Sequence, residues 1–323
     1  MVFWIILVVL IIIFAGWLLI GYFGFCKAMK RGYEVDMYDM ASLAGTPWNL
    51  YYDEIHEGLR WINGHEQEEV WIRSEDGLKL AGRLIENPNA TGTVLMFHGY
   101  RTHPEIDFSA AAHIYYGTGH NILLIDQRAA GNSEGKYIGF GVLERKDCKR
   151  WVEYVSGRFG EDHRILLGGL SMGASTVLMA CAEGLPQNVC GIVADSAFSS
   201  PKDIVLNQIR HSYHIRGNAI AAGIGFWCRL LAGYRLDEMS TWDAVKDSDI
   251  PVLFAHGTAD SRVPVEMTLK AASRCPAAKI MMITEGAEHG TGFLVDRERY
   301  EKALRSFLPN AHKGDAEQFE DFE

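Results

Sequence analysis

The sequence predicts an α/β fold in which a mostly parallel sheet is covered by helices on both faces. Two patterns predict it. Residues 70–84 alternate apolar and polar side chains around the turn Glu75-Asp-Gly77, as an antiparallel hairpin does. After this hairpin, short continuous apolar runs alternate with longer amphipathic segments, which is the pattern of buried parallel strands joined by helices.

The individual elements follow from the same patterns. Buried strands are expected at residues 93–97, 121–126, 165–167, 191–195, 251–255 and 279–283. Helices are expected at residues 104–116, 142–159, 174–183, 264–275 and 296–308. These elements belong to one domain at residues 68–310, and an acidic tail at residues 311–323 is expected to be disordered.

The interval at about residues 199–246 is too long for a single crossover between strands. It contains two helical patterns, so we expect a small helical lid inserted after the strand at 191–195. Between Ser200 and Arg235 the only acid is Asp203, and the segment is otherwise basic through Lys202, Arg210, Arg216, Arg229 and Arg235. This local excess of positive charge fits a solvated helical surface or contact with an anionic membrane surface.

The amino-terminal segment predicts a membrane anchor. Residues 2–26 carry no charged side chain, and about 20 apolar residues span a bilayer as a helix. A cleaved signal peptide is the alternative, but a basic leader and a small-residue cleavage site are missing. Lys27, Lys30 and Arg31 follow the segment directly, which places the rest of the chain on the cytoplasmic side of a cell membrane. We therefore expect a single-pass anchor at residues 1–26 and a helical lead-in at residues 27–67.

Composition excludes several classes of function. The net charge of −10 argues against a nucleic-acid-binding protein. The six cysteines show no zinc-ligand spacing and indicate a reducing compartment, so no metal is expected. The sequence contains no phosphate-binding loop and no dinucleotide fingerprint, so no cofactor is expected either.

The strongest motif is Gly169-Leu-Ser171-Met-Gly173, placed between the apolar run at residues 165–167 and a helix. This is the G-x-S-x-G pattern of a nucleophile elbow. Its serine sits on a strained turn, and side chains at Gly169 and Gly173 would collide across that turn. The amides at the start of the following helix point to the place where an oxyanion forms. Ser171 is thus the predicted nucleophile.

An activated serine needs a histidine as general base and a carboxylate that orients the histidine. Asp260 follows the strand at 251–255, and His289 follows the last strand, so acid and base come after Ser171 in the expected order. Both residues leave the carboxyl ends of parallel strands, where α/β sheets place their ligands. Asp195 also ends a strand and is the second choice for the acid. His256 is interpreted as structural.

The oxyanion hole is expected to combine two backbone amides, those of Met172 and Tyr100. Tyr100 belongs to the loop after the strand at 93–97. Four further residues are candidates for substrate contact, two in that loop and two in the lid: His98, Gly99, His211 and His214.

Five motifs occur in a fixed order: His98-Gly, Asp126-Gln-Arg128 with Gly131 and Ser133, Gly-Leu-Ser171-Met-Gly, His256-Gly-Thr-Ala-Asp260 and His289-Gly. Together they resemble the α/β-hydrolase superfamily over residues 68–309, and most nearly its bacterial membrane-anchored serine hydrolases. These lie near the serine aminopeptidase-like and monoglyceride-lipase-like branch. The resemblance implies an eight-stranded sheet, a lid after the sixth strand and an acyl-enzyme mechanism without metal or organic cofactor. Relatives commonly carry Gly-His where this chain has Ala129-Ala130.

The superfamily hosts many reactions on one scaffold, so the fold does not choose the substrate. An anchor together with an apolar, basic lid favours acyl esters of lipid-like molecules, and a carboxylesterase or lipase is the first hypothesis. A serine aminopeptidase is the second, although the lid has few acids to hold a substrate's ammonium group. A non-catalytic binding scaffold is the third, and the intact set Ser171, Asp260 and His289 argues against it.

Overall fold

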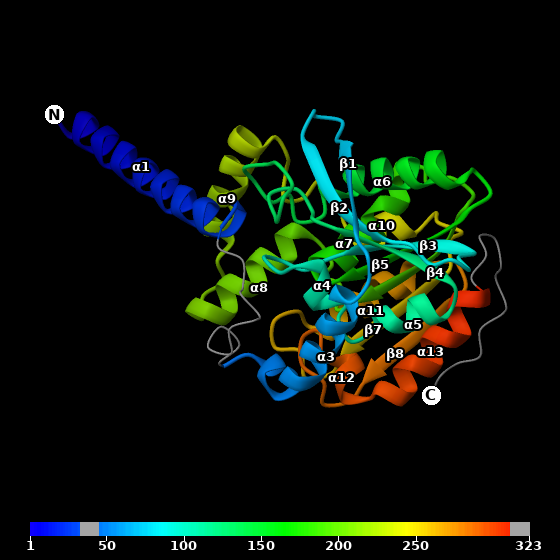
Figure 1. The fold of residues 1–323 in the computed structure, drawn as a ribbon. Helices are drawn as coiled ribbons and strands as arrows, with labels where there is room; N and C mark the ends of the chain where they lie inside the picture. The colour runs from blue at the N-terminus through cyan, green and yellow to red at the C-terminus, as the bar shows by residue number, and fades with distance from the viewer. Residues whose placement is uncertain (33–44, 311–323) are drawn as a thin grey trace.

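An eight-stranded sheet runs through the centre of the molecule (Figure 1). The computed structural model describes residues 1–32 and 45–310. The strands are β1 (Glu68–Arg73), β2 (Lys79–Ile85), β3 (Gly92–Phe97), β4 (His120–Ile125), β5 (Arg164–Leu170), β6 (Val189–Asp195), β7 (Val252–Gly257) and β8 (Lys279–Thr284). Every strand that the sequence predicts is present, within a few residues of its expected ends.

The strand order is β1-β2-β4-β3-β5-β6-β7-β8. The hairpin strands β1 and β2 pair antiparallel with each other, β2 pairs antiparallel with β4, and the remaining pairs are parallel. Phe97 at the end of β3 lies opposite Gly169, and Leu170 at the end of β5 lies opposite Asp195. The carboxyl ends of the central strands therefore meet at one edge of the sheet, which is where the predicted site residues follow them.

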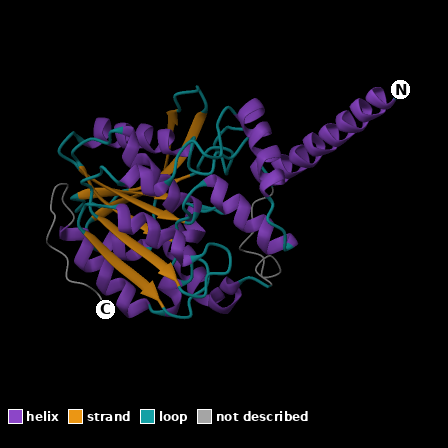
Figure 2. Ribbon diagram, turned by 180° about the vertical axis from the view of Figure 1, so that it is seen from behind, coloured by secondary structure: helices purple, strands orange, loops and turns teal. Residues whose placement is uncertain are grey.

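Helices cover both faces of this sheet, so that the strands form a layer between them (Figure 2). One core lies under α6 (Glu144–Phe159), α7 (Met172–Ala180), α10 (Thr241–Val245) and α11 (Val265–Arg274). The opposite core lies under α3 (Tyr52–Asn63), α5 (Ala112–Gly117), α12 (Gly292–Val295) and α13 (Arg297–Asn310). The short helices η1 (Pro47–Tyr51) and η2 (Cys181–Glu183) adjoin α3 and α7. The predicted α/β-hydrolase architecture is confirmed.

The helix expected at residues 104–116 is divided into α4 (Pro104–Asp107) and α5. The break lies where Gly58 of α3 packs against the backbone of Ser109, so closely that a side chain at Gly58 would overlap it. The Asp107 side chain is also turned away to bind the loop after β3. Contacts with neighbouring segments thus end a helix that local sequence alone would continue.

The lid follows β6, as expected, and consists mainly of α8 (Pro201–Tyr213), α9 (Asn218–Trp227) and η3 (Cys228–Ala232). Ser200 caps α8 by accepting a hydrogen bond from the amide of Asp203. Gly217, with a φ of 74°, makes the turn into α9. The end of η3 at Gly233 has a φ of 78°, and Tyr234 then returns the chain to the buried core.

The amino-terminal helix α1 (Val2–Met29) projects away from the domain, with the amino terminus at its far end (Figure 1). It is the one helix in the described part of the chain that is long and apolar enough to cross a membrane. It ends three residues beyond the expected anchor, because Phe25 and Met29 are buried against the domain. The expected lead-in is helical at η1 and α3, and its residues 33–44 lie outside the described residues, as does the predicted acidic tail at 311–323.

Candidate active site

Ser171 stands at the turn between β5 and α7. Its φ of 54° and ψ of −110° are a strained conformation for a residue with a side chain. A side chain at Gly169 would overlap the backbone of Gly173 across the turn, as expected. A side chain at Gly173 would instead overlap the carbonyl of Phe97 in β3. The neighbouring strand, rather than the turn itself, therefore requires the second glycine, which corrects the expectation from the sequence.

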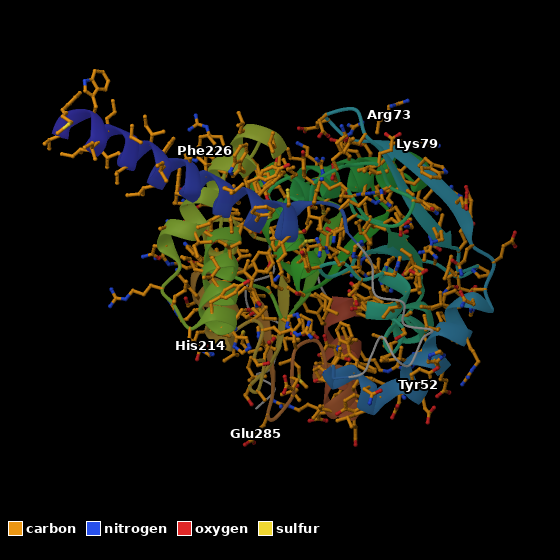
Figure 3. All side chains as sticks on the ribbon, turned by 90° about the vertical axis from the view of Figure 1, so that its left-hand side faces the viewer. Tyr52, Arg73, Lys79, His214, Phe226 and Glu285 are labelled. Carbon is orange, nitrogen blue, oxygen red and sulfur yellow. The ribbon has the colours of Figure 1, made fainter. Side chains whose placement is uncertain are left out.

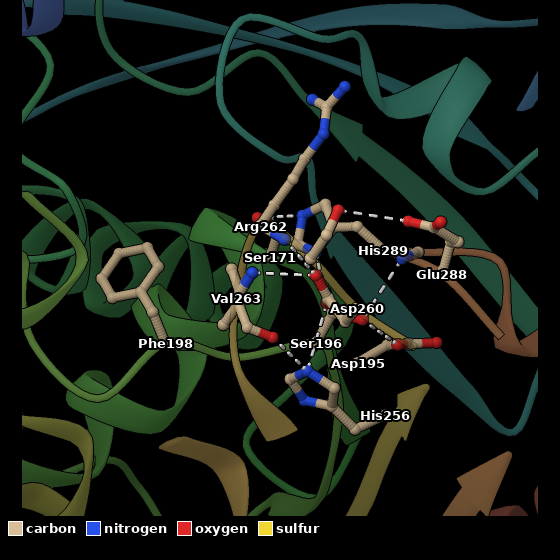
Figure 4. Close-up of polar contacts among 12 residues, drawn as sticks. Ser171, Asp195, Ser196, Phe198, His256, Asp260, Arg262, Val263, Glu288 and His289 are labelled. Carbon is tan, nitrogen blue, oxygen red and sulfur yellow. Dashed lines mark hydrogen bonds and ion pairs between the residues drawn. The ribbon is translucent and has the colours of Figure 1, made fainter. Parts of the chain in front are cut away.

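His289 lies between Ser171 and Asp260 and contacts both (Figure 4). Its Nε2 is 2.9 Å from the Ser171 Oγ, and its Nδ1 is 2.6 Å from the Asp260 Oδ2. Because a carboxylate accepts hydrogen bonds, Nδ1 carries the proton and Nε2 is left to accept the serine proton. The structure thus brings the three predicted residues together from the loops after β5, β7 and β8.

The Asp260 carboxylate is held in its charged form. Its Oδ1 accepts hydrogen bonds from the amides of Arg262 and Val263, at 2.9 and 2.8 Å, and its Oδ2 also lies 3.1 Å from the His256 Nε2. Burial by itself raises the pKa of Asp260, but the hydrogen bonds from His256 and His289 outweigh this and hold the pKa well below its usual value. The side chain therefore remains an acceptor for the histidine throughout the neutral range.

Asp195, the second choice for the acid, serves elsewhere. Its Oδ2 accepts a hydrogen bond of 2.8 Å from the Tyr300 hydroxyl, and its Oδ1 accepts one of 2.8 Å from Ser196. Its backbone carbonyl accepts the Ser171 amide at 2.8 Å. These contacts place Asp195 in the framework beneath the nucleophile turn, whereas Asp260 is the carboxylate that contacts His289.

The loop after β3 passes directly over Ser171. A Cβ built on Gly99 would be 3.5 Å from that of Ser171. The Gly99 amide is already engaged, because it donates to the Asp107 Oδ2 over 2.6 Å. No hydrogen bond to another described residue uses the amides of Tyr100 or Met172. Those two amides, the predicted oxyanion-hole donors, therefore remain available in the described part of the chain.

A sequence model of the prolyl oligopeptidase family matches residues 139–314, which is more than half of the chain and includes Ser171, Asp260 and His289. The chain belongs to the prolyl oligopeptidase family.

Curated relatives of this family member are similar over most of their length. The uncharacterized protein YqkD of Bacillus subtilis is 26% identical over 80% of this chain and 84% of its own. The α/β-hydrolase domain-containing protein WAV2 of Arabidopsis thaliana is 26% identical over 75% of this chain and 78% of its own. The similarity therefore extends well beyond the interval that the family model matches.

Solved structures are similar in fold. The Pyrococcus furiosus esterase Pf2001 has a TM-score of 0.63 and 22% identity, and covers 78% of this chain and 94% of its own. The Pyrococcus horikoshii acylaminoacyl peptidase has a TM-score of 0.57 and 17% identity, with 79% of this chain and 43% of its own covered. Both comparisons agree with the α/β-hydrolase fold described above.

The histidines proposed for substrate contact in this prolyl oligopeptidase-family chain are placed differently from one another. His98 is buried, its Nδ1 donates to the Gly99 carbonyl at 2.7 Å, and its Nε2 accepts the Gln127 amide at 3.1 Å. Both of its ring nitrogens are used to shape the loop that carries Gly99. His211 and His214 lie exposed at the carboxyl end of α8, and no described hydrogen bond joins them to the triad.

Two residues near the site have contacts that the sequence analysis did not predict: His256, which it interpreted as structural, and Asp107, which it did not name. His256 is buried and fixed by Thr268, at 2.8 Å from its Nδ1, in addition to its contact with Asp260. The spacing of four residues between His256 and Asp260, across the end of β7, is the signal that would have indicated this pair. Asp107 binds the Gly99 amide and the Thr102 hydroxyl, and burial raises the pKa of Asp107 although these two hydrogen bonds oppose the rise. A lone acid in a predicted helix gives no such signal.

A cavity of about 60 Å³ lies behind the nucleophile turn, against Trp48, Leu170, Asp195 and Gly290. Its lining includes neither Ser171 nor His289. Among the described residues, no group of three or more histidine, cysteine or acidic side chains is arranged to hold a metal ion.

Proposed function

We propose that this protein is a membrane-anchored serine hydrolase that cleaves carboxylic esters of apolar acyl groups. The observation that carries the proposal is the hydrogen-bonded row Asp260–His289–Ser171, with the serine in a strained turn at the start of a helix. A buried, charged acid behind a correctly oriented histidine is the arrangement that activates a serine hydroxyl.

The proposed reaction uses these groups in two half-reactions. The Ser171 Oγ attacks the ester carbonyl carbon while its proton passes to the His289 Nε2, and Asp260 stabilises the imidazolium. The amides of Tyr100 and Met172 face the developing oxyanion, each worth about 3 kcal/mol in the transition state. The intermediate collapses to the acyl-serine as His289 protonates the departing alcohol. Water, deprotonated by His289, then releases the acid and restores the serine.

Apolar side chains beside the nucleophile support an acyl substrate. Met172 belongs to a buried cluster that includes Phe198 and Phe140 and extends into the lid. The ring centres of Phe140 and Phe198 are 6.2 Å apart, and those of Tyr100 and Phe140 are 5.2 Å apart. We infer that the acyl group approaches this apolar cluster, whose side chains favour an apolar acyl group over a charged one.

A peptidase of the aminopeptidase type is the second candidate, and the match to the prolyl oligopeptidase family favours it. A substrate with a free amino terminus needs a carboxylate to bind its ammonium group. The one acid of the lid helices α8 and α9, Asp203, accepts a hydrogen bond of 2.7 Å from the Ser199 hydroxyl, beside the start of α8. This engagement of Asp203 is the reason for placing the ester hydrolase first.

We further propose that α1 is an uncleaved anchor and that the domain lies on the cytoplasmic side. The end of α1 is bound into the domain: the Ala28 carbonyl accepts the Tyr100 hydroxyl at 2.8 Å, and the Met29 carbonyl accepts the Ile138 amide at 2.7 Å. Phe25, within the apolar stretch itself, is buried against the domain as well, a contact that a removed leader peptide could not supply. Lys27 and Lys30 are exposed just beyond the apolar stretch, as the positive-inside rule requires of a cytoplasmic flank.

Fluorophosphonate labelling of the full chain in detergent micelles or nanodiscs tests the hydrolase proposal, with Ser171→Ala as the control. The full chain is needed because the end of α1 contacts the domain. We expect labelling of the wild type alone. Turnover should fall by about 10⁶-fold in Ser171→Ala and about 10⁴-fold in Asp260→Asn, and Asp195→Asn should be milder.

Substrate panels then separate the two candidate activities. Esters of graded acyl length should be cleaved faster than aminoacyl and acylaminoacyl anilides, and the reverse order would establish the peptidase. Absence of labelling in folded wild-type protein would refute both and leave a non-catalytic scaffold. If Asp195→Asn were more damaging than Asp260→Asn, the assignment of the acid would be wrong.

A further inference from the structure

The lid helix α9 packs along the carboxyl-terminal half of α1. Gly21 and Gly223 meet face to face, so closely that a side chain at Gly21 would overlap the Gly223 backbone. The Trp17 Nε1 donates to the Ala219 carbonyl at 2.7 Å, and the Trp227 Nε1 donates to the Leu18 carbonyl at 2.8 Å. Small residues at a close helix contact, together with hydrogen bonds between the helices, are typical of helix pairs in membranes.

The length of the uncharged stretch places this contact at membrane depth. A bilayer core of about 30 Å requires about 20 helical residues, and the charge-free residues are 2–26. Every window of about 20 residues within that stretch includes Trp17 through Gly21, which are the residues that contact α9. The part of α1 before Trp17 is only about 22 Å long at 1.5 Å per residue, which is too short to cross alone. If α1 spans the membrane, α9 must therefore enter it too.

The outer surface of α9 and η3 suits this depth. Phe226, Leu230 and Leu231 have 43%, 61% and 40% of their surfaces exposed, and Phe226 lies beside α1 (Figure 3). The ring centres of Phe226 and Trp17 are 6.3 Å apart, so the exposed apolar surface continues from one helix to the other. Arg229 is the single charged residue of α9 and η3, and it is exposed near the end, where a long side chain reaches the headgroups.

We propose that α9 and η3 form a second lipid-contacting element, seated in the interfacial layer of the bilayer beside α1. The occupant of this surface is the lipid itself, because the surface is continuous with a helix that lipid already surrounds. An interfacial helix buries its apolar face by about 5–10 Å, and the overlap of five residues between the span and α9 gives about 7 Å. The lid then remains at the membrane surface in every turnover. This inference rests on the proposed anchor role of α1.

The same arrangement gives the active site a lipid-facing wall. Ile224 and Cys228, on the inner side of α9 and η3, belong to the buried cluster that contains Met172, the residue after the nucleophile. Phe25 and Met29 at the end of α1 belong to this cluster as well. The apolar core beside the nucleophile is thus bounded by the two helices that contact lipid. We infer that the ester substrates are bilayer-resident lipids or amphiphiles that approach along α9.

Quenching by spin-labelled lipids tests the inference directly. An environment-sensitive fluorophore is attached at Leu230→Cys in the full chain, reconstituted in vesicles that contain phospholipid with a nitroxide at a shallow or a deep position. Ile12→Cys in α1 is the positive control, and Leu269→Cys on α11, another exposed leucine at 43% exposure, is the negative control. Every native cysteine is buried or half-buried, so wild-type protein treated alike measures the background.

We expect Ile12→Cys to be quenched by the deep nitroxide, Leu230→Cys by the shallow one, and Leu269→Cys by neither. Quenching at Leu230→Cys no greater than at Leu269→Cys overturns the inference, while quenching at Ile12→Cys shows that the span itself stands. If the fluorophore at position 230 is protected from the nitroxides and this protection disappears when the protein is diluted with lipid, a second copy of the chain covers α9. That result also overturns the inference. If Leu230→Cys folds poorly, Phe226→Cys is used for the same measurement. Fluorophosphonate labelling of each variant reports separately on the hydrolase proposal.

Discussion

Phe23 and Phe25 are two residues apart in α1, and their replacement by alanine tests whether the helix end is part of the domain. Phe25 is 1% exposed and its ring centre lies 5.1 Å from that of Tyr137, whereas Phe23 is 64% exposed. Removal of a buried phenylalanine side chain costs about 3–5 kcal/mol, because the cavity it leaves relaxes only in part. Exposed substitutions usually stay within about 0.5 kcal/mol.

We therefore expect Phe25→Ala to lower the free energy of unfolding by about 3–5 kcal/mol and Phe23→Ala to leave it nearly unchanged. In a domain of this size the loss corresponds to a fall in Tm of roughly 10 °C. Thermal unfolding in nanodiscs, followed by circular dichroism, measures both variants in the same lipid. Equal shifts in the two variants would refute the reasoning, because α1 would then be a tether that contributes nothing to the fold.

Two further predictions concern the domain interior. Gly173→Ala should abolish folding or strongly destabilise the protein, because the new methyl group overlaps the Phe97 carbonyl. Gly157→Ala, in the open interior of α6, should instead stabilise the protein by about 0.5–1 kcal/mol. Denaturant titrations that rank the two variants the other way would contradict this prediction. Burial, together with the charge of Arg164, lowers the pKa of His120 to about 4. Between pH 6.5 and pH 4 this histidine is therefore protonated in the unfolded chain and neutral in the folded chain. Stability should thus be full above pH 6.5 and fall by at most about 3 kcal/mol towards pH 4, and His120→Gln should flatten this pH dependence; an unchanged slope in the variant would reject the assignment.

Local patterns were sufficient to predict the sheet and the proximity of Ser171, Asp260 and His289. Each buried strand has a continuous apolar run, and Asp260 and His289 could be located because they follow such runs in a fixed order after the elbow. Once the strands are parallel, their carboxyl ends meet at one edge of the sheet. The proximity of Asp260 and His289 to Ser171 therefore follows from the parallel strand topology, which the order of the apolar runs predicts.

Contacts between distant segments could not be predicted in this way. The requirement for Gly173 comes from Phe97 in another strand, and the break between α4 and α5 comes from Gly58 in α3. The pairing of α1 with α9 joins residues more than 200 positions apart, and neither apolar helix reveals in its own sequence that the other is its partner. Such features depend on how finished helices and strands pack against one another, and the hydrophobic periodicity within a single element does not determine that packing.

The pairing of α1 with α9 also sets an order of events during synthesis. The hydrogen bonds that join the two helices have sequence separations of 202 and 209 residues. At about 5–20 residues per second, a ribosome takes roughly 10–40 s to make the partner after α1 has emerged. During that interval the Gly21 face of α1 lacks its partner α9. If α1 is the proposed anchor, its insertion is the first step and the docking of the lid helix α9 is a late one, so that the domain completes its fold at the membrane surface.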